Sequence, residues 1–196
     1  MYLTLTDIVL LTSIIQSLAL AVFLLLPSNS GLISNRLLVA TLVFFAAGLG
    51  EIFLYGSGLA FQHPNFAYLG TLIGLLQAGT LYLYAQSLMY QNFRLRGKHL
   101  VHTLLFWVVG AIFLIEYYLQ PSETKVQILL ERDHPGVLTS PLLAVAIHAV
   151  FLGYLCTTIR AINRFGLGIR QIFSSIENKQ LAWLRTLLIG YAVAWT

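Results

Sequence analysis

The sequence predicts an all-α fold, a polytopic transmembrane helix bundle. Three observations lead to this prediction: 58% of the 196 residues are hydrophobic, only 9% are charged, and the apolar residues gather in six long segments. A soluble domain carries about 25% charged residues, so a soluble fold of this size could not bury so much apolar surface. Inside a bilayer, each backbone polar group must be paired within its own segment, which favours helices.

Six segments are candidate spans, because a helix needs about 20 predominantly apolar residues to cross a bilayer. The first has no Lys or Arg before it and is longer than a signal-peptide core of about 7–15 residues, so we expect it to be retained. In the fifth, Pro141 falls in the first turn, where a missing amide hydrogen is harmless. The expected bounds are about 8–26, 37–61, 66–90, 100–119, 138–162 and 181–196.

The sixth segment is too short in its apolar part to cross a bilayer. From Leu187 to Thr196 it rises only about 15 Å, half of the hydrocarbon thickness. We therefore expect residues 1–196 to be a fragment, a single membrane domain from which a C-terminal cytoplasmic domain is absent.

The basic residues predict an N-terminus outside a multi-pass membrane protein, because cytoplasmic loops carry an excess of Lys and Arg. In that orientation the outer loops hold only Lys125 and Arg132, and Arg185 starts the sixth segment. The inner side receives Arg36, Arg94, Arg96, Lys98, Arg160, Arg164, Arg170 and Lys179. The loop at 120–139 then faces outward and is long enough to hold structure of its own.

Four polar side chains are expected near one depth of the bilayer, where such groups are costly and often functional. These are Gln16, Glu51, Gln77 and His148, at roughly 12–17 Å from the outer ends of their segments by helical rise. Glu51 and His148 could pair. The layer is either a set of hydrogen bonds that hold the helices together or a ligand- or proton-sensing pocket.

Small residues recur every four positions and predict close helix packing. Gly70, Gly74 and Ala78 do so in the third segment, and Ala46 and Gly50 in the second. The stripes serve packing inside the bundle or formation of a homodimer.

Residues for catalysis or cofactor binding are not recognisable. The single cysteine, Cys156, excludes an internal disulfide and a thiolate metal site. No zinc-protease or phosphate-loop motif is present. We therefore expect no enzyme activity, no metal and no cofactor.

The last connection contains a helix-start signal. Ser174 and Glu177 have the spacing of a capping box, in which each side chain bonds the other's backbone amide. Trp183 and Arg185 follow in the helix that this signal predicts.

Several stretches carry a resemblance to a known family. They are Tyr82–Leu88, Phe93–Arg96, Leu100–Phe106, Phe173–Glu177 and Leu181–Arg185. Together with the order of segments, they resemble the multi-span, seven-helix type N-terminal membrane sensory region of bacterial AraC-type transcription regulators. The resemblance implies about seven helices before a cytoplasmic helix-turn-helix domain. The seventh helix and that domain are absent from these residues.

The resemblance implies a sensory and signal-transduction module in the bacterial plasma (inner) membrane. It would couple an unknown small-molecule or membrane signal to transcription, and would contact DNA only through the missing domain. The polar layer and the 120–139 loop would meet the signal. Ser174, Glu177, Trp183 and Arg185 would transmit it on the inner side.

Two other functions remain open. A proton-coupled transporter or channel subunit could use Glu51, although no interrupted helices in matching halves are evident. An intramembrane serine protease is a remote alternative, because Gly56-Ser57-Gly58 could face His148 from another helix.

Overall fold

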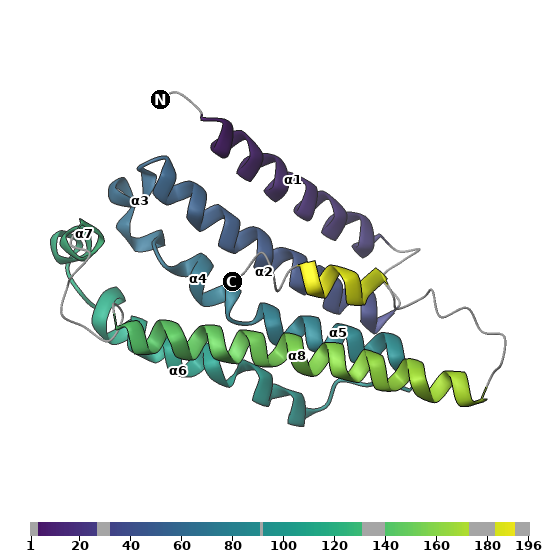
Figure 1. Cartoon of the computed structure of the whole chain (residues 1–196). Coiled ribbons are helices and arrows are strands. Elements are labelled where there is room, and N and C mark those ends of the chain that lie inside the picture. The colour runs from purple at the N-terminus through teal and green to yellow at the C-terminus, as the bar shows by residue number, and fades with distance from the viewer. Residues whose placement is uncertain (1–3, 27–31, 91, 131–139, 173–182, 191–196) are drawn as a thin grey trace.

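The computed structural model describes residues 4–26, 32–90, 92–130, 140–172 and 183–190 (Figure 1). None of these residues lies in a strand, and the predicted all-α fold is confirmed. The elements in chain order are α1 (Leu5–Leu25), α2 (Ile33–Gly56), α3 (Leu59–Gln62), η1 (Pro64–Phe66), α4 (Leu69–Gly74), α5 (Gln77–Met89), η2 (Gly97–Thr103), α6 (Leu104–Phe113), η3 (Leu114–Tyr118), α7 (Ser122–Leu130) and α8 (Pro141–Ile172). Residues 183–190 form a further helical stretch.

Five stretches of the described residues are long and apolar enough to cross a membrane. They are Leu5–Leu25, Ile33–Gly56, Pro64–Met89, Gly97–Tyr118 and Pro141–Leu167. Each overlaps one of the first five predicted segments, and together they indicate a membrane protein. Of the sixth predicted segment the structure describes only residues 183–190.

The first helix starts at a reciprocal cap. The hydroxyl oxygen of Thr4 accepts the backbone N–H of Asp7 at 3.2 Å, and the Asp7 carboxylate accepts the backbone N–H of Thr4 at 2.8 Å. This arrangement satisfies amides that have no partner within the first turn. Beyond the cap, α1 exposes large apolar side chains such as Ile15 and Val22, as a lipid-facing helix does.

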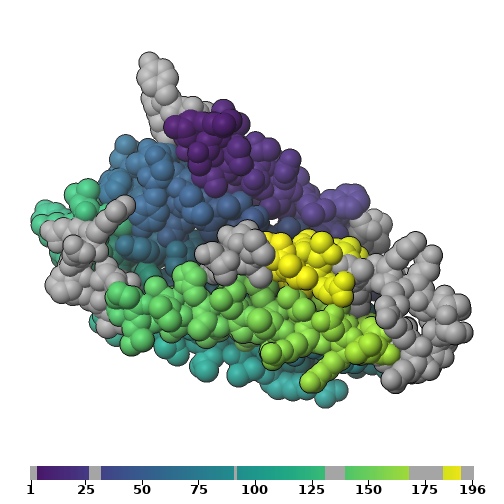
Figure 2. All heavy atoms as spheres, in the orientation of Figure 1, coloured from purple at the N-terminus to yellow at the C-terminus, as the bar shows by residue number. Residues whose placement is uncertain are grey.

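The core of the bundle is built around α2 and α5. α2 packs against α1, α4 and α5, and α5 also packs against α8. Figure 1 shows these helices running side by side along the long axis of the molecule. The stretch 183–190 joins the same core through Leu184 and Leu188, which are 1% and 0% exposed. Figure 2 shows this stretch lying between α1 and α8 on the surface of the bundle.

The third predicted segment, 66–90, is not one helix. Tyr68 has a φ of 66°, in the left-handed region, so regular helix resumes only at Leu69. A second interruption, at Leu75 and Leu76, separates α4 from α5. Interrupted backbone is tolerated at membrane depth only where other groups satisfy its polar atoms.

Other expected boundaries also need correction. α2 begins earlier than 37 and ends at Gly56 rather than at 61, because Gly58, with a φ of 77°, turns the chain into α3. α8 continues ten residues past the expected end at 162. Part of the 120–139 loop is helical, as α7, which packs on η1 and η3.

Candidate functional site: a tyrosine cluster beside a buried glutamate

Glu51 lies on α2 and is buried, with 7% of its surface exposed. Its carboxylate accepts two hydrogen bonds from Thr71, one from the backbone N–H and one from the hydroxyl, the latter at 2.9 Å. Thr71 is the third residue of α4, and Tyr68 before that helix provides no side-chain cap. Amides of a first turn lack partners within their own helix, and a negative charge there is favourable. Glu51 therefore caps α4 from a neighbouring helix.

Gly70 makes this contact possible. A Cβ atom built at Gly70 would overlap the carbonyl oxygen of Ala47 and lie 2.7 Å from the Cβ of Glu51. Real Cβ atoms do not approach so closely, so only glycine lets the first turn of α4 touch α2. The approach places the Glu51 carboxylate at the helix start.

Tyr68 connects the capped helix to a group of aromatic rings. Its ring meets that of Tyr117 edge-on, with centroids 4.9 Å apart and planes at 88°. The centroid of the Tyr68 ring also lies 5.1 Å from that of Phe113 and 6.1 Å from that of Tyr55. Left-handed backbone at a non-glycine residue costs on the order of 1–3 kcal/mol, so surrounding contacts must hold it. Edge-to-face packing of aromatic rings is favourable and helps to stabilise this backbone conformation of Tyr68.

Two successive tyrosines of η3 bond the interrupted backbone. The hydroxyl of Tyr117 donates to the carbonyl of Pro64 at 2.7 Å, and that of Tyr118 donates to the carbonyl of Ala67 at 2.8 Å. η3 is a π-helical turn, a wider form that often occurs at functional sites. These bonds satisfy carbonyls that lie outside regular helix. We call Tyr55, Tyr68, Tyr117 and Tyr118 the tyrosine cluster.

The hydroxyls of Tyr55 and Tyr68 have no such backbone partner among the described residues. The oxygen of Tyr55 is buried and makes no hydrogen bond within the described part of the chain. Nearby, the Lys125 ammonium donates to Asn65 at 2.8 Å and lies 5.9 Å from the centre of the Tyr117 ring. A buried phenol beside the Tyr68 ring, an ammonium group and a carboxylate are therefore gathered around one end of α4. Such groups can bind a polar ligand or stabilise the packing of the helices.

Removing a tyrosine hydroxyl is expected to have different effects at Tyr117, whose hydroxyl donates a hydrogen bond, and at Tyr55, whose hydroxyl does not. Tyr117→Phe is expected to lower the free energy of unfolding by about 1 kcal/mol, because the Pro64 carbonyl loses the hydroxyl donor and keeps only the backbone N–H of Ala67. Tyr55→Phe is expected to leave stability unchanged or slightly increase it, because no bond is lost. Unfolding of both variants in detergent micelles, followed by circular dichroism, measures the difference. Equal losses in the two variants would contradict the hydrogen-bond assignment.

The structure does not bring the predicted polar layer together. Glu51 and Gln77 are buried, but Gln16 and His148 are exposed. Glu51 bonds Thr71 rather than His148, and Nδ1 of His148 lies 2.7 Å from the carbonyl oxygen of Ala144 in its own helix. Depth along a helix follows from sequence position. The direction in which a side chain points depends on how each helix is rotated in the bundle.

The small-residue stripe is divided by the break between α4 and α5. Ala46 and Ala78 are buried in the core. A Cβ atom at Gly50 or Gly74 would meet nothing within 4 Å, in contrast to Gly70. The three positions of the third segment therefore do not form one continuous packing face.

The predicted inner-loop residues are only partly described. Ser174 and Glu177 lie outside the described residues. Trp183 and Arg185 are exposed on the helical stretch whose other side buries Leu184 and Leu188.

Sequence reasoning missed the tyrosine cluster. Tyr117 and Tyr118 fall at the predicted end of the fourth segment, where tyrosine is common at a membrane interface and indicates no site. Tyr68 gave no signal because its surroundings are apolar. The helix-breaking residues Gly58 and Pro64, close in sequence, were the available sign that irregular backbone would need partners. Among the described residues, no group of three or more His, Cys, Asp or Glu side chains could hold a metal ion.

No family model, curated protein or solved structure matches this chain. The chemistry of the site and the arrangement of the helices are therefore the basis for a functional proposal.

Proposed function

We propose that this chain is the sensory module of a bacterial signal-transduction protein of the plasma membrane, with its N-terminus outside. The observation that carries the proposal is the contact of Glu51 with the first turn of α4. It joins a polar, aromatic site at one end of the bundle to a short helix inside an interrupted span. The resemblance to AraC-type sensory regions supports a transcriptional output through a cytoplasmic helix-turn-helix domain.

Charge distribution supports the orientation. The tyrosine cluster lies at the end of the bundle that holds α3 and α7 (Figure 1). The basic residues Arg94, Arg96 and Lys98 follow α5, whose far end points away from α7. An excess of Lys and Arg marks the cytoplasmic side, so the tyrosine cluster would face outward.

The proposed mechanism is a shift between two packings of the bundle. A signal can drive such a shift only by binding one packing better than the other. In one packing Glu51 caps α4, and in the other it does not. A change of 1–2 kcal/mol in this contact alters the ratio of the two packings by about five- to thirtyfold. Because α4 leads into α5, and α5 packs against α8, the change would reach the end of α8.

A proton-coupled carrier is the second candidate, favoured by the interruption of the third span. Carriers place coupling sites at discontinuous helices near the middle of the membrane. Glu51 stands at such a discontinuity, since it bonds the start of α4. A carboxylate there could take up and release a proton.

Transcript profiles of bacteria carrying the parent gene test the proposal. Glu51→Gln is expected to change the abundance of a defined set of transcripts, because it weakens the cap on α4. Glu123→Gln is the matched control, because Glu123 is an exposed carboxylate on α7. Both variants must be present in the membrane at the level of the unmodified protein.

Proteoliposomes containing the purified protein provide the second readout. Proton or solute flux that depends on Glu51, together with unchanged transcripts, would contradict the sensor and support the carrier. Changed transcripts without flux would exclude the carrier.

A further inference from the structure

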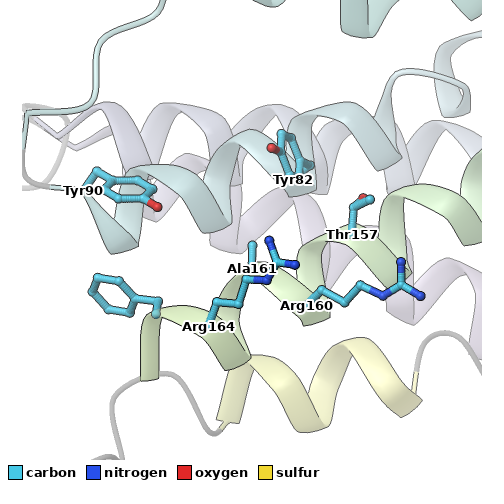
Figure 3. Close-up of a pocket in the computed structure, with 7 residues that line it drawn as sticks. Tyr82, Tyr90, Thr157, Arg160, Ala161 and Arg164 are labelled. Atoms are coloured by element: carbon cyan, nitrogen blue, oxygen red, sulfur yellow. The ribbon is translucent and has the colours of Figure 1, made fainter. Parts of the chain in front are cut away.

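A groove lies between α5 and α8, away from the tyrosine cluster. Its volume is about 510 Å³, within the range of about 300–1,000 Å³ that small-molecule sites occupy. Figure 3 shows Tyr82 on α5, and Tyr90 directly after its end, on one side of the groove, with residues of α8 on the other. The lining residues are Tyr82, Tyr90, Thr157, Arg160, Ala161, Arg164 and Phe165.

The groove carries two positive charges on one side. Arg160 and Arg164 are one helical turn apart and therefore lie on the same face of α8. Figure 3 shows Arg164 reaching toward α5, while Arg160 extends along α8 in the direction of Thr157. Both side chains are exposed, and neither has an ion-pair partner within the described ranges of the chain. None of the described lining residues is acidic, so this part of the wall would not repel an anion.

Hydroxyl groups complete the lining. Neither the Tyr82 nor the Tyr90 hydroxyl makes a hydrogen bond to a described residue, so both can donate to a ligand. The Thr157 hydroxyl already bonds the carbonyls of Gly153 and Tyr154 in its own helix, at 2.7 and 2.9 Å. Phe165, with its ring centre 6.1 Å from that of Tyr90, forms an apolar end to the groove.

We propose that this groove binds a phosphate group, supplied by the headgroup of an anionic membrane lipid. Guanidinium groups bind phosphate through paired hydrogen bonds, and phenol hydroxyls add single donors. The lining lies toward the ends of two candidate spans, Pro64–Met89 and Pro141–Leu167, where headgroups meet the hydrocarbon. Basic pockets between helices on the cytoplasmic side suit lipid phosphates. The site does not depend on the sensory function proposed above.

Native mass spectrometry of the whole chain, released from nanodiscs, tests the proposal. The nanodiscs contain phosphatidylcholine with a minor fraction of phosphatidylglycerol, and the measured quantity is phosphatidylglycerol retained per protein. The double variant Arg160→Gln, Arg164→Gln is expected to retain at least about tenfold less, because charge-assisted hydrogen bonds are lost. Arg94→Gln, Arg96→Gln removes the same charge from an exposed loop and is expected to change retention by less than about twofold.

Two further variants keep the proposal testable if the glutamine variant does not fold. Arg160→Lys, Arg164→Lys keeps the charge but loses the paired geometry of guanidinium. Tyr82→Phe, Tyr90→Phe keeps the charge and removes the two donors. Both are expected to retain less phosphatidylglycerol than the unmodified chain.

Inorganic phosphate distinguishes the source of the group. Millimolar phosphate is expected not to displace the lipid, whereas displacement would identify a site for free phosphate. Equal losses in the groove and loop variants, or no loss in either, would overturn the site.

Discussion

Glu51→Ala is expected to lower the free energy of unfolding by roughly 2–4 kcal/mol. The substitution removes the acceptor for the backbone N–H and the hydroxyl of Thr71, and hydrogen bonds to charged groups contribute about 1.5–3 kcal/mol each. Part of the lost hydrogen-bond energy is offset, because the variant no longer has to desolvate a carboxylate on folding. Denaturant unfolding in detergent micelles, followed by circular dichroism, provides the measurement.

Two variants serve as controls for that loss. Glu123→Ala removes an exposed carboxylate and is expected to change stability by no more than about 0.5 kcal/mol. Glu51→Gln keeps an oxygen that can accept the Thr71 N–H, so its effect should lie between those of the two alanine variants. If Glu51→Ala and Glu123→Ala unfold at the same denaturant concentration, Glu51 does not cap α4.

Gly70→Ala is the second substitution with a large expected effect, a loss of about 2–3 kcal/mol. The added methyl group would overlap the carbonyl oxygen of Ala47, which belongs to the backbone of α2 and cannot turn aside. α4 and α2 must then separate, as in other overpacked contacts, where losses of about 1–3 kcal/mol are typical. Separation would also move Thr71 away from Glu51.

Gly74→Ala is the matched control in the same short helix. A methyl group at Gly74 meets nothing within 4 Å, and alanine is the better helix former by about 1 kcal/mol. The expected result is unchanged or increased thermal stability, against a clear decrease for Gly70→Ala. Similar shifts in the two melting temperatures would contradict the close contact between α4 and α2.

The existence of the spans was predictable, because length and apolar composition alone decide whether a helix can cross a bilayer. The break at Tyr68 was not. The residues around it, from Phe66 to Leu69, are apolar and lack a turn signal. A left-handed tyrosine is held there by contacts from η3, more than 40 residues later in the chain, and such contacts leave no local pattern.

The candidate site was predictable in part. Glu51 stood out because a carboxylate at bilayer depth needs a partner. The sequence offered His148 as a possible partner, whereas the structure shows hydrogen bonds from Thr71. Thr71 could not be foreseen, since threonine is common in apolar helices and a backbone amide has no sequence signature. Gln16 lies on a helix that is apolar on all sides, so the face it presents could not be chosen from periodicity. These failures concern the rotation of helices and breaks in the backbone, neither of which follows from position along the chain.

The contact between Glu51 and Thr71 is the central claim, because it holds the interrupted span in place and links it to the tyrosine cluster. Magic-angle-spinning NMR of the protein in lipid bilayers can measure the dipolar coupling between the Glu51 carboxyl carbon and the Thr71 amide nitrogen. A coupling typical of a directly hydrogen-bonded pair is predicted, and it should vanish in Glu51→Ala. Absence of the coupling in the unmodified chain, with Thr71 otherwise ordered and helical, would contradict the account.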